Sequence, residues 1–529
     1  MLDRVELYDT TLRDGAQMVG LTLSLEDKLK ILHALDGLGV PYVEGGWPGA
    51  NPKDTEFFRI AARESLTGSA VTAFGMTRRP RERAADSPIV RDLLDAETEV
   101  VCVVGKTWDL HVTETLRAML AEGIAMIEDT LRFLVSEGRR VFFDAEHFFD
   151  GYRSNPAYAL ACLRAAEEAG AERLVLCDTN GGTLPSEIAR VVGEVATRVD
   201  SPLGVHTHDD AGCAVANSIA AVEAGAVQVQ GTVNGYGERC GNANLLTVAA
   251  NLELKLGITA LPDGSLARLT EVSHYVAEVA NLHPNGQQPY VGRNAFAHKA
   301  GLHTSALARR PGAYEHVSPD VVGNESQMVV SELAGRAALL RKAAELGVQL
   351  TGDQADKALA RLKERESDGY SFEAADASLE LLLARVNGHD ARDPERSFEL
   401  ESFRVLVEKR ESEGTIAEAT VKVRAGGRRH IATAEGAGPV GALDNAIRQA
   451  LGGVFPELDA FTLTDYRVRV LDSKRGTQAV VRVLIETSDG EKEWSTVGVS
   501  DNIIEASWEA LAESLVYGLL HPRHEAAAG

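Results

Sequence analysis

The sequence has few cysteines, no long apolar run and no excess of basic residues. Its five cysteines are scattered, odd in number and without a CxxC pair: Cys102, Cys162, Cys177, Cys213 and Cys240. This pattern fits a reducing compartment better than a disulfide framework. No apolar run reaches the roughly 18 residues of a membrane helix, and the opening MLDRVELYD has no signal-peptide core. We therefore predict a cytoplasmic protein without a membrane partner.

The charge and length set further limits. A net charge of −24 at pH 7 argues against a nucleic-acid partner, because surfaces that bind nucleic acids are basic. The 529 residues are enough for two to four domains of roughly 150 residues each. Apolar content of 44% and charged content of 25% are ordinary for a globular protein.

Short apolar runs recur through the first part of the chain, with helical patterns between them. Near-continuous apolar runs are typical of parallel strands that are buried on both faces. Two intervening segments, residues 24–39 and 155–170, carry apolar residues at helical spacing and end in glycine. The expected strands are 5–9, 42–46, 70–75, 99–105, 140–145, 173–178, 202–206 and 226–233.

Eight such units within residues 1–275 match the size of a (β/α)8 TIM barrel. A doubly wound open sheet is the structural alternative. In a barrel, the active site lies at the carboxyl ends of the strands. Nearly all the expected strands here end in polar or ionisable side chains, which simple surface exposure does not explain well.

His206 and His208 follow the seventh expected strand. Side chains two residues apart on a strand leave on the same face, so both imidazoles can converge on one metal ion. With Asp14, they would form a set of one carboxylate and two imidazoles that leaves coordination positions open, as catalytic metal sites do. Such an ion would polarise the ketone of a bound 2-oxo acid, and Arg13 could stabilise the developing alkoxide.

Four motifs, in the same order along the chain, resemble those of one enzyme family. They are DTTLRDGAQ (9–17), HTHDD (206–210), GYGERCGNANL (235–245) and NAFAHKAGLHTSA (294–306). Together they are similar to the 2-isopropylmalate, homocitrate and citramalate synthases. More distant relatives are 3-hydroxy-3-methylglutaryl-CoA lyase and the carboxyltransferase domains.

The resemblance implies functions for the matching residues. Asp14, His206 and His208 would hold a divalent ion (Mn, Zn or Mg), with Asn242 as a direct or water-mediated fourth ligand. The resemblance implies substrate binding by Arg13, Gln17, Glu44 and Thr179. It implies catalysis, including deprotonation of an acetyl methyl group, by Arg13, Glu146, His303 and Tyr314.

Two further segments resemble a bacterial subgroup of citramalate synthases: EGGWPGANPKD (44–54) and DGYSFEAADASLELL (368–382). The implied reaction joins acetyl-CoA to pyruvate and releases (R)-citramalate and CoA, the first step of a pyruvate route to isoleucine. A bulky Trp47 near the site would suit a methyl-bearing oxo acid. The alternatives are a 2-isopropylmalate synthase-type enzyme with another 2-oxo acid, an acyl-CoA lyase or aldolase on the same metal site, and a non-catalytic amino-acid-binding regulator.

The barrel pattern stops near residue 275. Residues 276–395 are expected to form helical linker subdomains that carry catalytic residues, and residues 523–529 a tail. Residues 396–522 contain two repeats of three strands and a helix, which would pair to complete one core. This part resembles the family's C-terminal regulatory domain, which implies a homodimer and isoleucine as the inhibitor. A dimerisation domain without a ligand is the alternative.

Overall fold

The computed structural model describes residues 2–298, 306, 309–310, 312–328, 336–372, 375–387, 397–410, 414–471 and 479–521. The chain forms two compact units. The first comprises Met1–Phe296 and Glu315–Ser326, and the second comprises Ala297–Tyr314 and Gln327–Gly529. Across the described ranges, we find no helix with the length and apolar character needed to cross a membrane.

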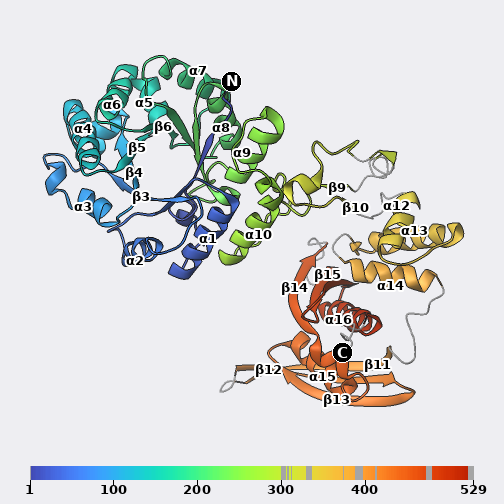
Figure 1. Ribbon diagram of the computed structural model, residues 1–529. Helices are drawn as coiled ribbons and strands as arrows, with labels where there is room; N and C mark the ends of the chain where they lie inside the picture. The colour runs from blue at the N-terminus through green and yellow to red at the C-terminus, as the bar shows by residue number, and fades with distance from the viewer. Residues whose placement is uncertain are drawn as a thin grey trace. The chain divides into compact units, whose positions relative to one another are not determined.

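The first unit is a closed barrel of eight parallel strands in sequential order, with β1 paired to β8 (Figure 1). The predicted TIM barrel is therefore confirmed, and the open-sheet alternative is wrong. The strands are β1 Glu6–Asp9, β2 Tyr42–Gly46, β3 Ala70–Met76, β4 Val100–Lys106, β5 Arg140–Glu146, β6 Arg173–Asp178, β7 Leu203–Thr207 and β8 Gln228–Gly231.

Helices surround the barrel and cover the outer face of the strands (Figure 1). They are α1 Leu25–Leu38, α2 Pro52–Ala61, α3 Pro88–Asp95, α4 Leu120–Ser136, α5 Phe148–Ser154, α6 Pro156–Glu168, α7 Pro185–Val195, α8 Ala214–Glu223, α9 Leu245–Asn251 and α10 Leu269–Val279. The sequence predicts α1 well, because Ser24 and Asp27 form a capping box and Gly39 ends the helix with φ at 90°.

Alternate residues of each strand contact two different layers. Those that face outward pack against the helices, as Leu7, Val101 and Phe143 do. Those that face inward fill the barrel with Tyr8, Tyr42, Phe74, Val100, Cys102 and Phe142. Inward-facing positions nearer the carboxyl ends of the strands include the polar residues Asp144 and His206, so this apolar cluster lies beneath a partly polar site.

Asp36, near the end of α1, fixes the loop that enters β3. Its carboxylate accepts hydrogen bonds from the backbone N–H groups of Thr67, Gly68 and Ser69 and from the Thr67 hydroxyl. Burial alone would raise the pKa of Asp36, but these hydrogen bonds outweigh it and lower the pKa to about 2. The ionised carboxylate therefore stabilises the folded barrel.

We expect Asp36→Ala to lower the free energy of unfolding of the barrel by about 1–3 kcal/mol at pH 7, because it removes a charged acceptor of four hydrogen bonds. The folded pKa lies below the unfolded value of about 3.9, so this stabilisation is complete only above about pH 5. It disappears as the pH falls toward 2. Urea denaturation of both proteins at pH 7, 5 and 3 would measure the difference, and a difference that widened at pH 3 would contradict the assignment.

The second unit begins with a short parallel pair, β9 Ala297–His298 and β10 Gln327–Met328. Within the described ranges after residue 335, this unit continues with the helices α12 Arg336–Glu345, α13 Gly352–Ser367 and α14 Asp376–Val386. They share a core that includes Leu339, Leu362 and Leu383 and extends to Val497 in the C-terminal part. Helix α14 therefore packs directly on the following domain.

The C-terminal part contains the two predicted βββα repeats. The first is β11 Phe398–Arg410, β12 Gly414–Ala425, β13 Arg428–Gly436 and α15 Pro439–Leu451. The second is β14 Thr462–Val470, β15 Val481–Ser488, β16 Glu493–Ser500 and α16 Ile503–Leu520. Each repeat has an antiparallel three-stranded sheet. One core joins both repeats through residues such as Ile447 and Leu515, and the predicted architecture is confirmed.

Candidate metal and active site

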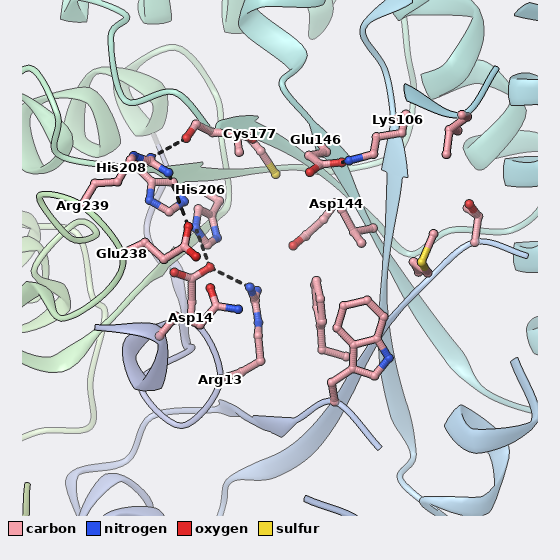
Figure 2. A pocket seen from close by; sticks show the side chains of 18 residues that line it. Arg13, Asp14, Lys106, Asp144, Glu146, Cys177, His206, His208, Glu238 and Arg239 are labelled. Carbon is pink, nitrogen blue, oxygen red and sulfur yellow. Dashed lines mark hydrogen bonds and ion pairs between the residues drawn. The ribbon is translucent and has the colours of Figure 1, made fainter. Parts of the chain in front are cut away.

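A cavity of about 330 Å³ opens at the carboxyl ends of the barrel strands. Its wall holds acidic, basic and imidazole side chains from five different strands or the loops that follow them. Figure 2 shows Arg13, Asp14, His206 and His208 together in one part of the wall. Lys106 and Glu146 lie together in another part.

Asp14, His206 and His208 converge at this cavity. One ligand atom from each side chain lies within 4.8 Å of those of the other two. All three residues are buried, with at most 6% of their surface exposed. His206 faces into the barrel from β7, His208 follows two residues later, and Asp14 lies in the loop after β1. The structure thus brings together the three residues that the sequence predicted as a cluster.

The charges of these groups suit a cation. Burial alone would raise the pKa of Asp14, but Arg13 and the two imidazoles outweigh it and hold that pKa well below its usual range. Burial, followed by the nearby His206, lowers the pKa of His208 to about 3, so this ring is neutral at physiological pH. An ionised carboxylate beside a neutral imidazole is the form in which these side chains bind metal ions.

Two further observations fit a divalent ion among these residues. The buried Nδ1 atom of His208 has no hydrogen-bond partner in the described part of the chain. Asn242 Nδ2 donates to Asp14 Oδ1 at 2.9 Å and to the Tyr236 carbonyl at 3.0 Å. The Asn242 Oδ1 atom therefore faces His206 Nε2, at 2.9 Å. Carboxylate, imidazole and amide oxygen atoms do not distinguish Mn, Zn and Mg.

Arg13 connects this cluster to Glu44. Its Nη1 atom donates to Asp14 Oδ2 at 2.6 Å and its Nε atom to Glu44 Oε1 at 2.5 Å. The guanidinium carbon lies 3.7 Å from the centre of the Phe74 ring. These three contacts fix the plane of the guanidinium group beside the candidate metal position.

Glu44 does not line the cavity, contrary to our expectation. Its side chain is fully buried and accepts hydrogen bonds from Tyr8, Thr10 and Arg13. Glu44 can lie at this depth because it faces inward from β2, among groups that neutralise its charge. Glu44 contacts Arg13 from this buried position.

The other predicted residues of the barrel lie at the cavity. Gln17, Glu146 and Thr179 all line it, and Glu146 forms an ion pair with Lys106. The Thr179 hydroxyl accepts a hydrogen bond from the His147 N–H at 2.9 Å. Tyr314 belongs to the second unit, where it is 45% exposed, and His303 lies outside the described residues.

Sequence reasoning missed the apolar part of the wall and one buried amide. Trp47, which the sequence did not place, lines the cavity and packs edge-on against Phe74 at 5.5 Å between ring centres. Leu116 and Met76 continue this surface. The buried amide is Gln230, which hydrogen-bonds to His206. The alternation VQVQ in β8 is a sequence signal for it, because alternate polar residues indicate a polar inner face.

Three family models match successive parts of the chain. The HMGL-like model matches residues 4–276. The model described as the homocitrate synthase post-HMGL domain-like region matches residues 290–369. The LeuA allosteric (dimerisation) domain matches residues 373–519. This last match includes α14, which agrees with the packing of that helix on the C-terminal part.

Curated relatives resemble the chain over nearly its full length. A protein of Streptomyces coelicolor named (R)-citramalate synthase is 53% identical, over 98% of this chain and 97% of the relative. Proteins with the same name from Synechocystis and Aquifex aeolicus are 50% and 48% identical. The match to the Synechocystis protein covers 97% of this chain and 96% of the relative. The match to the Aquifex aeolicus protein covers 99% of each.

Proposed function

This chain belongs to the (R)-citramalate synthase family, and from that premise we propose how its site carries out the family reaction. The enzyme condenses acetyl-CoA with pyruvate and hydrolyses the thioester, which gives (R)-citramalate and free CoA. The observation that supports this function best is the near-complete match to curated (R)-citramalate synthases at 48–53% identity. The same matches do not favour a 2-isopropylmalate synthase, a lyase or a non-catalytic regulator.

We propose that Asp14, His206, His208 and Asn242 hold a divalent metal ion. When bound, such an ion would supply Lewis-acid polarisation of the pyruvate ketone. The buried, preorganised side chains support this assignment, since they present a negative carboxylate and neutral nitrogen and oxygen donors without rearrangement. The cavity beside them leaves room for the two adjacent oxygen atoms of a 2-oxo acid.

Arg13 is the residue we assign to the keto oxygen. As the carbon–carbon bond forms, this oxygen gains negative charge, and a fixed guanidinium beside it lowers the energy of that state. We assign the pyruvate carboxylate to Thr179, whose hydroxyl accepts a hydrogen bond from the backbone N–H of His147 and can donate its own proton to the carboxylate. Gln17 completes this substrate-binding set at the same cavity.

We assign the proton transfers to Glu146, His303 and Tyr314. Removal of a proton from the acetyl methyl group creates the carbon nucleophile that attacks the pyruvate ketone, and a water molecule then cleaves the thioester. Glu146 is an accessible carboxyl group at the cavity, where it forms an ion pair with Lys106. The roles of His303 and Tyr314 rest on their resemblance to the corresponding positions of the family.

The apolar wall supports pyruvate as the preferred 2-oxo acid. Trp47, Phe74 and Leu116 line the cavity, and we propose that they contact the methyl group of pyruvate and disfavour a branched side chain. One or two extra methyl groups change binding in an apolar pocket by about 1–3 kcal/mol. We therefore expect preference rather than absolute exclusion of larger oxo acids.

Acetyl-CoA-dependent thiol release tests the function directly. Pyruvate, 2-oxobutyrate, 2-oxoisovalerate and 2-oxoglutarate would be compared at matched concentrations with a colorimetric thiol reagent. We expect kcat/KM to be highest with pyruvate. A preference for 2-oxoisovalerate would instead indicate leucine synthesis, and no release with any of the four would overturn the condensing activity.

We also propose that the C-terminal domain binds isoleucine as a feedback inhibitor and joins two chains into a homodimer. The match to the LeuA allosteric (dimerisation) domain over residues 373–519 supports both ideas. The placement of the enzyme in isoleucine synthesis and in the cytoplasm stays a prediction from the sequence.

Isoleucine is expected to bind the full chain and inhibit thiol release, with valine at least about 10-fold weaker because it lacks one methylene group. Isothermal titration with isoleucine, leucine and valine measures binding, and the thiol assay at the same concentrations measures inhibition. If none of the three produced heat or changed the rate, the domain would be a dimerisation module without an amino-acid ligand.

A further inference from the structure

A line of three buried polar side chains crosses the inside of the barrel beneath the candidate metal position. His206 on β7 and Gln230 on β8 are neighbours in the strand register. Asp144 faces them from β5, on another side of the barrel. His206, Gln230 and Asp144 are all at least 96% buried. Polar groups buried to this extent need hydrogen bonds to be tolerated.

The hydrogen bonds along this line have only one consistent direction. Gln230 Nε2 lies 2.9 Å from Asp144 Oδ1. Burial raises the pKa of Asp144, to about 6, so the carboxyl group is mainly ionised at neutral pH and can only accept. The Gln230 amide nitrogen must therefore face Asp144, which turns its Oε1 atom toward His206.

This orientation determines which nitrogen of His206 carries the proton. Gln230 Oε1 lies 2.8 Å from His206 Nδ1, and an amide oxygen only accepts. Nδ1 therefore carries hydrogen. In the neutral ring, the lone pair then lies on Nε2, the atom that is 2.9 Å from Asn242 Oδ1 and 4.0 Å from Asp14 Oδ2. Two acceptor atoms that face each other at this distance repel unless a cation lies beside them.

We propose that Gln230 and Asp144 are positioning residues that fix the Nδ1–H tautomer of His206 and aim its Nε2 lone pair at the metal. Asp144 orients the Gln230 amide, and the amide orients the imidazole. Groups that orient metal-binding histidines in this way typically change metal affinity by about 10–100-fold when they are removed. This inference rests on the metal site proposed above.

Three variants separate this role from simple loss of packing. Gln230→Leu removes both hydrogen bonds. Gln230→Glu keeps the size and an acceptor for His206 Nδ1, and the introduced carboxyl can share one proton with Asp144. Gln228→Leu is the matched control, because Gln228 is a fully buried glutamine two residues earlier on the same strand. Its amide lies near Glu6.

Mn²⁺ affinity, measured by electron paramagnetic resonance titration, is the first measurement. We expect Gln230→Leu to bind Mn²⁺ about 10–100-fold more weakly than the wild type, and Gln230→Glu and Gln228→Leu to stay within a few-fold of it. Equal affinities for Gln230→Leu and Gln228→Leu would overturn the proposal, as would Gln230→Glu behaving like Gln230→Leu. Circular dichroism melting of each variant identifies any general loss of folding.

The tautomer itself is the second measurement, and it needs neither metal nor activity. Long-range ¹H–¹⁵N spectra of histidine-labelled, metal-free enzyme distinguish the two neutral tautomers, and the His206 signals are assigned by their absence in His206→Asn. We expect the Nδ1–H form in the wild type and Gln228→Leu, and its loss in Gln230→Leu. An Nε2–H form in the wild type would overturn the proposal, whereas failure of Mn²⁺ to bind a wild type with the Nδ1–H form would overturn the metal site alone.

Discussion

Asp14→Ala is expected to abolish divalent metal binding and to lower kcat by at least about 10³-fold. Asp14 provides the one carboxylate among the three clustered side chains, so its removal takes away the charge that attracts a cation. Lewis-acid polarisation of a carbonyl contributes several kcal/mol, and about 4 kcal/mol corresponds to that loss of rate. Metal content after gel filtration and the thiol-release assay measure the two effects on one preparation.

Asp36→Ala is the matched control for this substitution. It also removes a buried, hydrogen-bonded carboxylate from the barrel, but at the loop that enters β3. We expect it to lose stability while it keeps bound metal and turnover. Full activity of Asp14→Ala in metal-free buffer would contradict the metal assignment, and equal loss of metal in both variants would indicate a folding defect.

The sequence predicts the barrel well because buried parallel strands have a distinct composition. The expected strand at residues 42–46 coincides with β2, whereas the expected strand at 226–233 is longer than β8, Gln228–Gly231. At that end, the chain turns through Asn234, whose φ of 60° is not compatible with a strand. Apolar composition locates the centre of a strand, but the turn that ends it depends on contacts with other loops.

The convergence of Asp14, His206 and His208 could also be predicted, since strand alternation places both imidazoles on one face. The burial of the Glu44 side chain could not be predicted from the sequence. A carboxylate at the end of a strand looks the same in the sequence whether it reaches the cavity or, as here, lies buried beside Tyr8 and Thr10. Charge neutralisation by residues from another strand decides between these positions, and this requires three-dimensional contacts.

Arg13→Lys is expected to lower kcat by about 10²-fold while Mn²⁺ affinity stays within a few-fold of the wild type. Lysine keeps the positive charge but is a single point donor, so it cannot bind Asp14 and Glu44 together in the planar geometry of a guanidinium group. Loss of one well-placed donor to a developing oxyanion costs about 10²–10³ in kcat. The metal ligands themselves are untouched, so binding and catalysis should separate.

Arg173→Lys is the control that makes this separation informative. Like Arg13, Arg173 donates through two of its nitrogens to carboxylate oxygens, here Nε and Nη2 to Glu6 at 3.1 and 3.0 Å, and it also lies over an aromatic ring, that of Phe142. It starts β6, at the opposite end of the barrel from the cavity, so its replacement should affect stability and leave kcat nearly unchanged. If Arg13→Lys retained full kcat with pyruvate, a positive charge alone would be sufficient beside Asp14, and the fixed guanidinium plane would have no part in stabilising the alkoxide.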